Sequence, residues 1–236
     1  MVVGWGKQRL LKQRAPIGRG AILDAGMVIA GRPGTKAVRF RDIAVELGMD
    51  AETVGKQFRD QDDLTAALFD RVVLIIIERV TVDPANWREY LTTGAEKCLE
   101  VFLGYPCLGA EAAAGRTVGP AELGMMESLL DALRTAGLND AEMLRFYAAY
   151  SSFTFAFCAT AARDRLAPRT QASMPGWVQP AAMISPDEHP NVTALWPRLI
   201  ALDYRSTFLN ALSVICDGIE AAAAAARAPV ESPRPA

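Results

Sequence analysis

Residues 43–54 read IAVELGMDAETV, and this stretch decides the fold. A helix-turn-helix needs a small residue where its two helices cross and a turn residue that tolerates a left-handed backbone. Ala44 and Gly48 meet these two needs. Asp50 is suited to begin the second helix, because its carboxylate can accept a hydrogen bond from a backbone N–H of the first turn. The positions that must fill the small core are apolar: Ile43, Leu47, Met49 and Val54.

Helical spacing of apolar residues continues through most of the chain, so helices are the only regular structure predicted. Asn139 and Glu142 have the spacing of a capping box, and Asp83-Pro84 has the pattern of an N-cap followed by proline. The apolar run 72–77 could instead form a strand, but its length and lead-in favour a helix. Helices are expected at residues 19–30, 41–47, 51–58, 62–82, 83–103, 120–136, 139–166, 191–202 and 203–227, with a short segment near 108–114.

These elements predict an all-α fold in two parts. We expect a flexible basic arm at residues 1–18, a three-helix helix-turn-helix domain at 19–61, a larger helical domain at 62–228 and a disordered tail at 229–236. Residues 1–60 contain 11 Lys/Arg and 6 Asp/Glu, whereas the remaining 176 residues contain 14 and 21. The N-terminal part is therefore the candidate for binding a polyanion.

The composition is that of a globular protein, with 51% hydrophobic and 22% charged residues in a chain of 236. The apolar run 72–77 is too short for a membrane span, and no apolar segment follows the basic N-terminal residues. We therefore expect a cytoplasmic protein without membrane contact. The cysteines are too far apart for a CxxC pair and are expected to be buried, reduced thiols: Cys98, Cys107, Cys158 and Cys216.

Two groups of residues resemble the TetR family of regulators. The first covers about residues 19–69 and includes Ile22-Leu23-Asp24-Ala25, Arg41-Asp42-Ile43-Ala44, Phe58 and Leu64. The second resembles the Tet-repressor type of C-terminal domain and consists of His189-Pro190, Leu195, Leu199, Phe208, Leu212 and Gly218. The resemblance implies a homodimer that places each recognition helix in the major groove of double-stranded operator DNA.

The exposed side of the helix at 51–58 is expected to contact this DNA. Thr53, Lys56 and Gln57 lie there, since Val54 and Phe58 are spaced four apart and point inward. Gln57 can read a base edge, whereas Lys56 is suited to phosphate. Further contacts are expected from Arg19, Arg41 and four residues of the arm: Lys7, Arg9, Lys12 and Arg14.

Three residues of this region depart from the family pattern. Members usually place a tyrosine at the position of Gly55 and a lysine at the position of Gln61, and both commonly contact phosphate. Gly55 also weakens the recognition helix by up to ~1 kcal/mol relative to alanine. Glu52 adds a carboxylate near the expected path of the DNA backbone. These departures favour an alternative function, a TetR-like dimeric sensor or interaction protein that has lost specific DNA binding.

The larger domain is expected to bind a small apolar or aromatic effector and to form the dimer. Aromatic and methionine linings suit such ligands, and the candidates lie on helices that enclose a pocket in the family: Trp87, Tyr90, Phe102, Tyr105, Met125, Met126, Tyr147 and Tyr150. Two apolar stripes are expected to build a four-helix bundle across the dimer axis: Phe153, Phe157, Phe208, Leu212, Ile215 and Ile219. Either the candidate ligand residues or the two apolar stripes could instead belong to the ordinary hydrophobic core.

Catalytic residues, metal ligands and cofactors are not expected. The single His189 lies in a proline-rich segment, and the sequence contains no GxSxG, HExxH or phosphate-loop motif. The expected function is therefore that of a ligand-responsive transcriptional regulator. It would act as a repressor that binds a palindromic operator as a dimer and is released by its effector.

Overall fold

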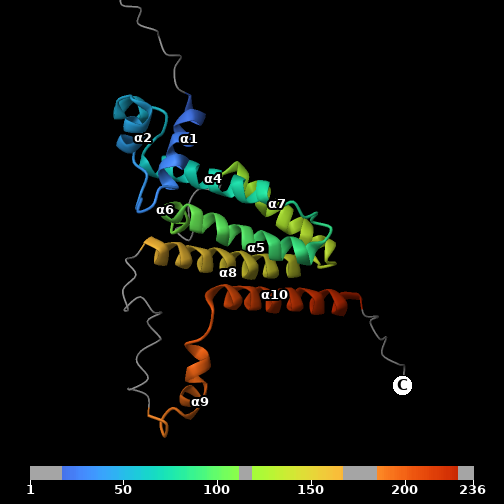
Figure 1. Cartoon of the computed structure of the whole chain (residues 1–236). Helices are drawn as coiled ribbons and strands as arrows, with labels where there is room; N and C mark the ends of the chain where they lie inside the picture. Colours follow the sequence, from blue (N-terminus) through green and yellow to red (C-terminus); the bar gives the residue numbers. More distant parts are fainter. Residues whose placement is uncertain (1–17, 112–118, 167–184, 228–236) are drawn as a thin grey trace, which may run out of the picture.

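The computed structural model describes residues 18–111, 119–166 and 185–227, and all regular structure in these ranges is helical, as predicted. Figure 1 shows the first three helices at one end of the molecule, beside the start of the fourth. The helices are α1 (Arg19–Ala30), α2 (Phe40–Leu47), α3 (Ala51–Gly55), α4 (Gln61–Arg79), α5 (Trp87–Gly104), α6 (Pro106–Gly109), α7 (Pro120–Thr135), α8 (Asp140–Leu166), α9 (Pro190–Leu199) and α10 (Tyr204–Arg227).

The predicted turn between α2 and α3 is confirmed. Gly48 has φ 65° and ψ 42°, in the left-handed region that favours glycine. The side chain of Asp50 accepts a hydrogen bond from the backbone N–H of Thr53 at 2.7 Å, so it is the N-cap of α3. The prediction that α3 continues to Phe58 is wrong, because the helix ends at Gly55. A glycine at this point lowers the helix propensity of an already short segment.

One core joins the helix-turn-helix to the first half of α4. Its fully buried side chains come from four helices: Ile22, Ile43, Val54, Leu64 and Leu68. Gly26 of α1 allows α4 to approach closely, since a Cβ at this position would lie 2.7 Å from a methyl carbon of Leu68. The orientation of α4 is therefore fixed by its packing against the helix-turn-helix.

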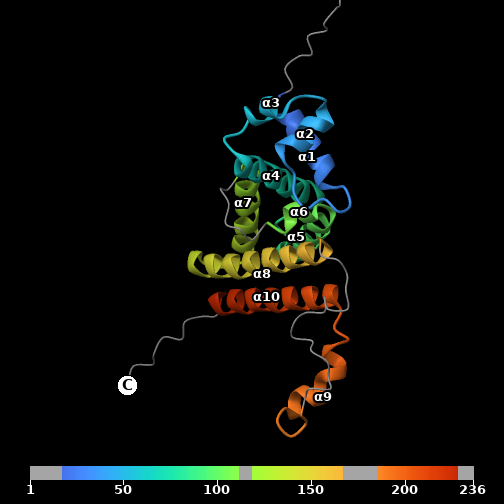
Figure 2. The same ribbon diagram turned by 90° about the vertical axis from the view of Figure 1, so that its left-hand side faces the viewer.

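The larger body is built around α8, which packs against α5, α6, α7 and α10. The predicted capping box at its start is confirmed. The N–H of Asn139 donates to the Glu142 carboxylate at 3.2 Å, and the N–H of Glu142 donates to the Asn139 side chain at 3.0 Å. α10 runs along α8 in both views, whereas α9 stands away from the body (Figures 1 and 2). No residue of α9 is buried.

Two helix boundaries differ from the prediction. Asp83-Pro84 does not open α5, because the carbonyl and the carboxylate of Asp83 accept hydrogen bonds from Asn86 and Ala85 and form a turn. The helix begins after this turn, at Trp87. α4 ends at Arg79 instead of Val82, since the backbone is extended at Val80. The alternative strand at 72–77 is also wrong, because these residues lie within α4.

α10 is unusually apolar for its exposure. Within the described ranges it is the one helix long and apolar enough, by length and composition alone, to cross a membrane, a test that core helices of soluble proteins also pass. Only 28% of its most apolar 18 residues is buried. α10 therefore presents apolar surface that a single copy of the chain leaves uncovered.

Replacing Gly48 or Gly55 by alanine is predicted to change the free energy of unfolding in opposite directions. Gly48→Ala should lower the free energy of unfolding by about 1–2 kcal/mol, because it forces a Cβ into the left-handed region. Gly55→Ala should raise it by about 0.5–1 kcal/mol, since the added Cβ would meet only a ring carbon of Phe40, at 3.9 Å. Urea unfolding followed by circular dichroism measures both changes. A Gly48→Ala variant as stable as the parent would contradict this account of the turn.

Candidate DNA-binding and ligand-binding sites

The exposed face of α3 and the turn after it carry the predicted DNA contacts. Thr53, Lys56 and Gln57 are all exposed. The hydroxyl of Thr53 donates to the Asp50 carboxylate at 2.7 Å, and this bond, with that of the Thr53 N–H, lowers the pKa of Asp50. The ammonium of Lys56 lies 3.0 Å from a carboxylate oxygen of Glu52, one turn earlier. The side chain of Gln57 makes no hydrogen bond to any described residue.

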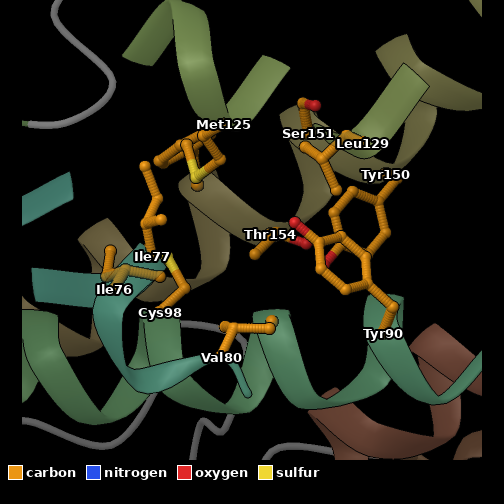
Figure 3. A pocket seen from close by; sticks show the side chains of 12 residues that line it. Ile76, Ile77, Val80, Tyr90, Cys98, Met125, Leu129, Tyr150, Ser151 and Thr154 are labelled. Atoms are coloured by element: carbon orange, nitrogen blue, oxygen red, sulfur yellow. The ribbon is translucent and has the colours of Figure 1, made fainter. Parts of the chain in front are cut away.

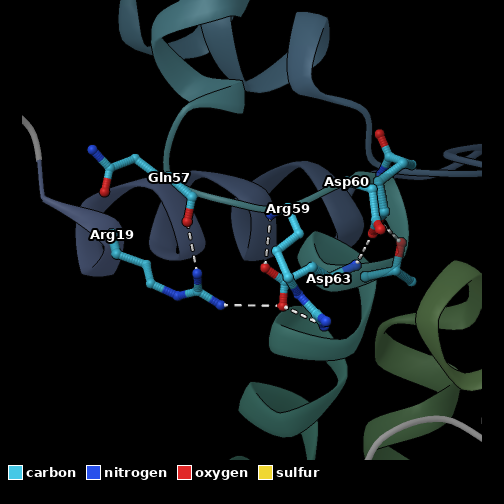
Figure 4. A network of polar contacts seen from close by, with 7 residues as sticks. Arg19, Gln57, Arg59, Asp60 and Asp63 are labelled. Atoms are coloured by element: carbon cyan, nitrogen blue, oxygen red, sulfur yellow. Dashed lines mark hydrogen bonds and ion pairs between the residues drawn. The ribbon is translucent and has the colours of Figure 1, made fainter.

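Arg19 holds the end of the recognition segment in place. Its guanidinium donates to the backbone carbonyl of Gln57 at 2.7 Å, lies 4.2 Å from the ring centre of Phe58 and is 3.7 Å from Asp63 (Figure 4). A hydrogen bond from the Arg59 N–H and the positive charges of Arg19 and Arg59 lower the pKa of Asp63. The guanidinium of Arg19 is thus paired with groups of the protein and holds the segment after α3 in place. Its contact with DNA stays a prediction.

The remaining predicted DNA contacts are placed differently. Arg41 is exposed and lies 3.6 Å from Asp42 on the same helix. The side-chain amide of Gln61, which stands where the family has lysine, donates to the carbonyl of Val38 at 2.9 Å and joins α4 to the segment before α2. Sequence reasoning missed the exposed cations Lys36 and Arg39 of this segment. The predicted arm contacts lie outside the described residues: Lys7, Arg9, Lys12 and Arg14.

A cavity opens between four helices of the larger body (Figure 3). Its described lining comes from the end of α4, from α5, from α7 and from the middle of α8. None of these residues is charged, and most are apolar. They are Ile76, Ile77, Val80, Tyr90, Gly94, Cys98, Met125, Leu129, Tyr150, Ser151, Thr154 and Phe155. This mostly apolar lining with a few polar groups is typical of a small-molecule pocket.

The cavity contains three of the residues predicted to bind a ligand, namely Tyr90, Met125 and Tyr150. Phe102 lies in the core instead, with its ring centre 5.9 Å from those of both Phe69 and Phe155. The other four predicted ligand residues are also absent from the described lining: Trp87, Tyr105, Met126 and Tyr147. Spacing along one helix could have indicated Ser151 and Thr154, which follow Tyr150 on α8. No sequence pattern near the residues of α4 indicates that they line the cavity.

Polar groups of the cavity are concentrated on α8. The hydroxyl of Tyr150 donates to the carbonyl of Leu91 at 2.7 Å, and burial raises the pKa of this phenol well above its usual value. The hydroxyls of Ser151 and Thr154 are buried without a hydrogen-bond partner among the described residues. Cys98 also lines the cavity, and burial together with the neighbouring thiol of Cys158 raises its pKa. All four cysteines are buried and free, as predicted.

The aromatic stripes predicted to form the dimer join α8 to α10 within one copy of the chain. The ring of Phe208 stacks on Phe153 and Phe157, with centre distances of 5.6 and 4.7 Å. Phe208, Leu212 and Ile219 are fully or almost fully buried in this way, and Ile215 is half-buried. These side chains face the protomer's own core because α10 covers α8 along this side. The outward faces of both helices carry small residues: Ala148, Ser152 and Ala156 on α8, and Thr207, Val214 and Ala221 on α10.

Metal-ligating side chains are not clustered among the described residues. His189 is exposed at the start of α9, and no three metal-ligating side chains converge in those ranges. The chemical groups that the fold does assemble are an exposed polar helix face and a buried apolar cavity. Both are suited to binding.

Known proteins are similar to this chain in sequence. Residues 82–223 match the family described as the tetracyclin repressor-like C-terminal domain, which confirms the resemblance of the C-terminal residues. The HTH-type transcriptional repressor DrrR1 of Streptomyces coeruleorubidus is 26% identical over 128 residues. This match spans 52% of the chain and 46% of that relative, which is about half the length of each.

Solved structures share the fold over nearly the whole chain. Apo ActR from Streptomyces coelicolor has a TM-score of 0.75 and 23% identity, covering 90% of this chain and 99% of ActR. ActR in complex with actinorhodin has a TM-score of 0.73 at 23% identity, covering 89% and 99%. The helix-turn-helix packed on a helical domain and the family match over more than half of the sequence lead to one conclusion: the chain belongs to the TetR family of transcriptional regulators.

Proposed function

We propose that this protein is a ligand-responsive repressor of the cytoplasm, which binds a palindromic operator as a dimer and is released by a small apolar or aromatic effector. The observation that carries the proposal is the position of α4. Leu64 and Leu68 in its first half belong to the core of the helix-turn-helix, whereas Ile76 and Ile77 in its second half line the cavity. A ligand that shifts the second half of this helix must act on the orientation of the first.

Operator binding is assigned to the exposed face of α3 and its flanking cations. The repressor named above as a relative supports this assignment. Gln57 is best placed to read a base, because its amide offers a donor and an acceptor and has no partner among the described side chains. Lys56 is suited to phosphate. Arg41, Lys36 and Arg39 add positive charge on the same end of the molecule.

The Lys56–Glu52 pair provides the experiment that tests DNA binding. Fluorescence anisotropy with the protein's own upstream DNA should give an affinity that falls steeply with salt. Lys56→Gln should weaken binding to all sequences and reduce the salt slope by about one per half-site. Glu52→Gln should strengthen binding, since it removes a carboxylate from the DNA face and releases the ammonium of Lys56. Equal affinities for all three proteins would contradict a role of α3 in phosphate contact.

Sequence preference is expected to depend on Gln57. Gln57→Ala should cost about 1–3 kcal/mol on the best operator and little on unrelated DNA, because only the base contact is lost. The backbone carbonyl that Arg19 holds is retained in this variant. Equal losses on operator and unrelated DNA would show that Gln57 does not read sequence.

Dimerisation is assigned to the small outward faces of α8 and α10. Small side chains let helices of two copies approach closely, and a twofold axis matches a palindromic site. Val214 is 71% exposed at the centre of the α10 face. The apolar, mostly uncovered character of α10 supports this assignment. The stripe around Phe208 contributes by holding α10 against α8.

Val214→Glu should therefore convert the dimer to a monomer in sedimentation velocity, because it places a charge in the proposed interface. Leu123→Glu is the matched control, since Leu123 is 57% exposed on α7, away from both faces. The control should remain dimeric. A Val214→Glu protein that remains fully dimeric would overturn the assignment.

Effector binding is assigned to the cavity, and the solved complex of ActR with actinorhodin supports a ligand-responsive function. Asp70 of α4 joins α7, which lines the cavity, to the helix that packs against the helix-turn-helix. Its carboxylate accepts hydrogen bonds from the N–H groups of Ala121 and Glu122, at 2.9 and 3.2 Å, and so caps α7. Two residues of α7, Met125 and Leu129, line the cavity. A displacement of α7 by ligand is therefore transmitted to α4.

Asp70→Ala should reduce the change in operator affinity caused by the tightest binder from a panel of uncharged aromatic compounds. Loss of the cap should lower this coupling by about 0.5–2 kcal/mol, with binding of each partner alone retained. Asp131→Ala on the exposed face of α7 is the control, because Asp131 pairs only with Arg134 of its own helix. Unchanged coupling in Asp70→Ala would contradict this route.

The second candidate function is a dimeric sensor that does not bind specific DNA. The observations that favour it are the early end of α3 at Gly55, the internal use of Gln61 and the pairing of Lys56 with Glu52. The same salt titration separates the two functions. A sensor would show no preference for its upstream DNA over an unrelated duplex, while its cavity would still bind ligands.

A further inference from the structure

Ser151 and Thr154 of α8 differ from those helical hydroxyls that bond to their own helix. A serine or threonine inside a helix commonly donates to the backbone carbonyl four residues earlier. Seven others do so at 2.8–3.0 Å: Thr65, Thr92, Ser128, Thr135, Thr160, Thr193 and Thr207. Ser151 and Thr154 make no such bond, and their oxygens are buried without a partner in the described part of the chain. Both residues line the cavity.

Two unpaired hydroxyls in an apolar interior are costly, and buried polar groups in proteins almost always find partners. Ser151 and Thr154 are three residues apart, so they are neighbours on one face of α8. In Figure 3 the labelled side chains that bear hydroxyls lie toward one side of the cavity, and Ile76, Ile77 and Met125 lie toward the other. The cavity thus has an apolar part and a polar part with donors available.

The described lining also excludes a class of ligand. It contains no charged side chain that could pair with an ionised group. Burying an unpaired carboxylate or ammonium in such surroundings is far more unfavourable than burying a neutral polar group. The donors of Ser151 and Thr154 are neutral, and they match a neutral acceptor such as a carbonyl oxygen.

We propose that the effector is an uncharged molecule with an apolar body and a carbonyl-type acceptor, and that Ser151 and Thr154 select it by donating hydrogen bonds to that oxygen. This inference rests on the proposed effector role of the cavity. It adds the chemical class of the ligand and names the residues that determine specificity. Tyr150 is a weaker candidate for this role, because its hydroxyl proton already goes to the Leu91 carbonyl.

Three probes of the same ring system test the proposal by titration calorimetry on the full chain. Fluorene is the hydrocarbon, 9-fluorenone adds the carbonyl, and 9-oxofluorene-4-carboxylate adds a charge. We expect fluorenone to bind about tenfold or more tighter than fluorene, the size expected for satisfying buried donors. The carboxylate should bind at least tenfold more weakly than fluorenone.

The double variant Ser151→Ala with Thr154→Val should abolish the preference for fluorenone and leave fluorene binding equal or tighter. Fluorene binding also shows that the cavity of the variant is intact. Thr160→Val is the matched control, because its hydroxyl donates to the Ala156 carbonyl and the residue is exposed. In the infrared spectrum, the carbonyl band of bound fluorenone should lie at lower frequency in the parent than in the double variant.

The outcomes separate this inference from the proposed function. If fluorene and fluorenone bind the parent equally, or if the double variant keeps the preference, the ligand class is wrong and the cavity remains a ligand site. Tight binding of the carboxylate likewise overturns the uncharged class alone. If none of the three probes binds the parent up to its solubility, both the ligand class and the effector role of the cavity are overturned.

Discussion

The packing of Leu68 against Gly26 is the contact on which the rest of the structure depends. It brings α4 close to α1, because any side chain at residue 26 would collide with the leucine methyl groups. α4 thereby takes part in one continuous core that includes residues of the helix-turn-helix and of the larger domain. A stiff helix shared in this way cannot move in one domain without consequence in the other. The coupling of the domains thus follows from ordinary core packing.

The aromatic contacts between α8 and α10 determine which residues of these two helices face outward. The rings of Phe153, Phe157 and Phe208 give these helices a thick aromatic seam inside the protomer. The hydroxyl of Tyr204 closes the end of this seam by donating to the carbonyl of Phe157 at 2.9 Å. Because the large aromatic side chains point inward, the outward faces include small residues such as Ala148, Ser152 and Ala221, beside the exposed Leu144. The aromatic seam thus sets the position of these outward faces.

The sequence predicted most reliably those features that depend on only a few neighbouring residues, namely turns and helix caps. Gly48, Asp50 and the Asn139–Glu142 pair are local signals, because a turn or a cap forms among neighbours, and all were confirmed. The early end of α3 was missed. Gly55 has a low helix propensity, but whether a helix continues past a glycine also depends on tertiary packing, which the sequence does not show. The turn at Asp83 was misread because an aspartate before proline fits either a cap or a turn.

Non-local features were harder to predict, for a different reason. Periodicity identifies the apolar side of α10, but it cannot tell whether another helix of the same copy or a second copy covers that side. Phe208, Leu212 and Ile219 of this stripe are buried within one copy, and their part in the dimer stays a prediction. The cavity is built from four helices, so its composition depends on their relative placement. Tyr90, Met125 and Tyr150 were found through family resemblance, whereas Ile76 and Val80 required the structure.

One residue of the cavity wall has a consequence for how such proteins diversify. Gly94 lies in the middle of α5, where glycine is a poor helix former, and a Cβ there would meet the Tyr150 hydroxyl oxygen at an ordinary contact distance of 3.5 Å. Alanine, serine or valine at this position would each occupy part of the chamber without displacing α4. Under the proposed function, a single substitution at Gly94 would change the size of the ligand that the cavity accepts and leave the residues of the helix-turn-helix unchanged. Gly94 would then be a natural starting point for evolution, or an engineer, to alter the choice of ligand.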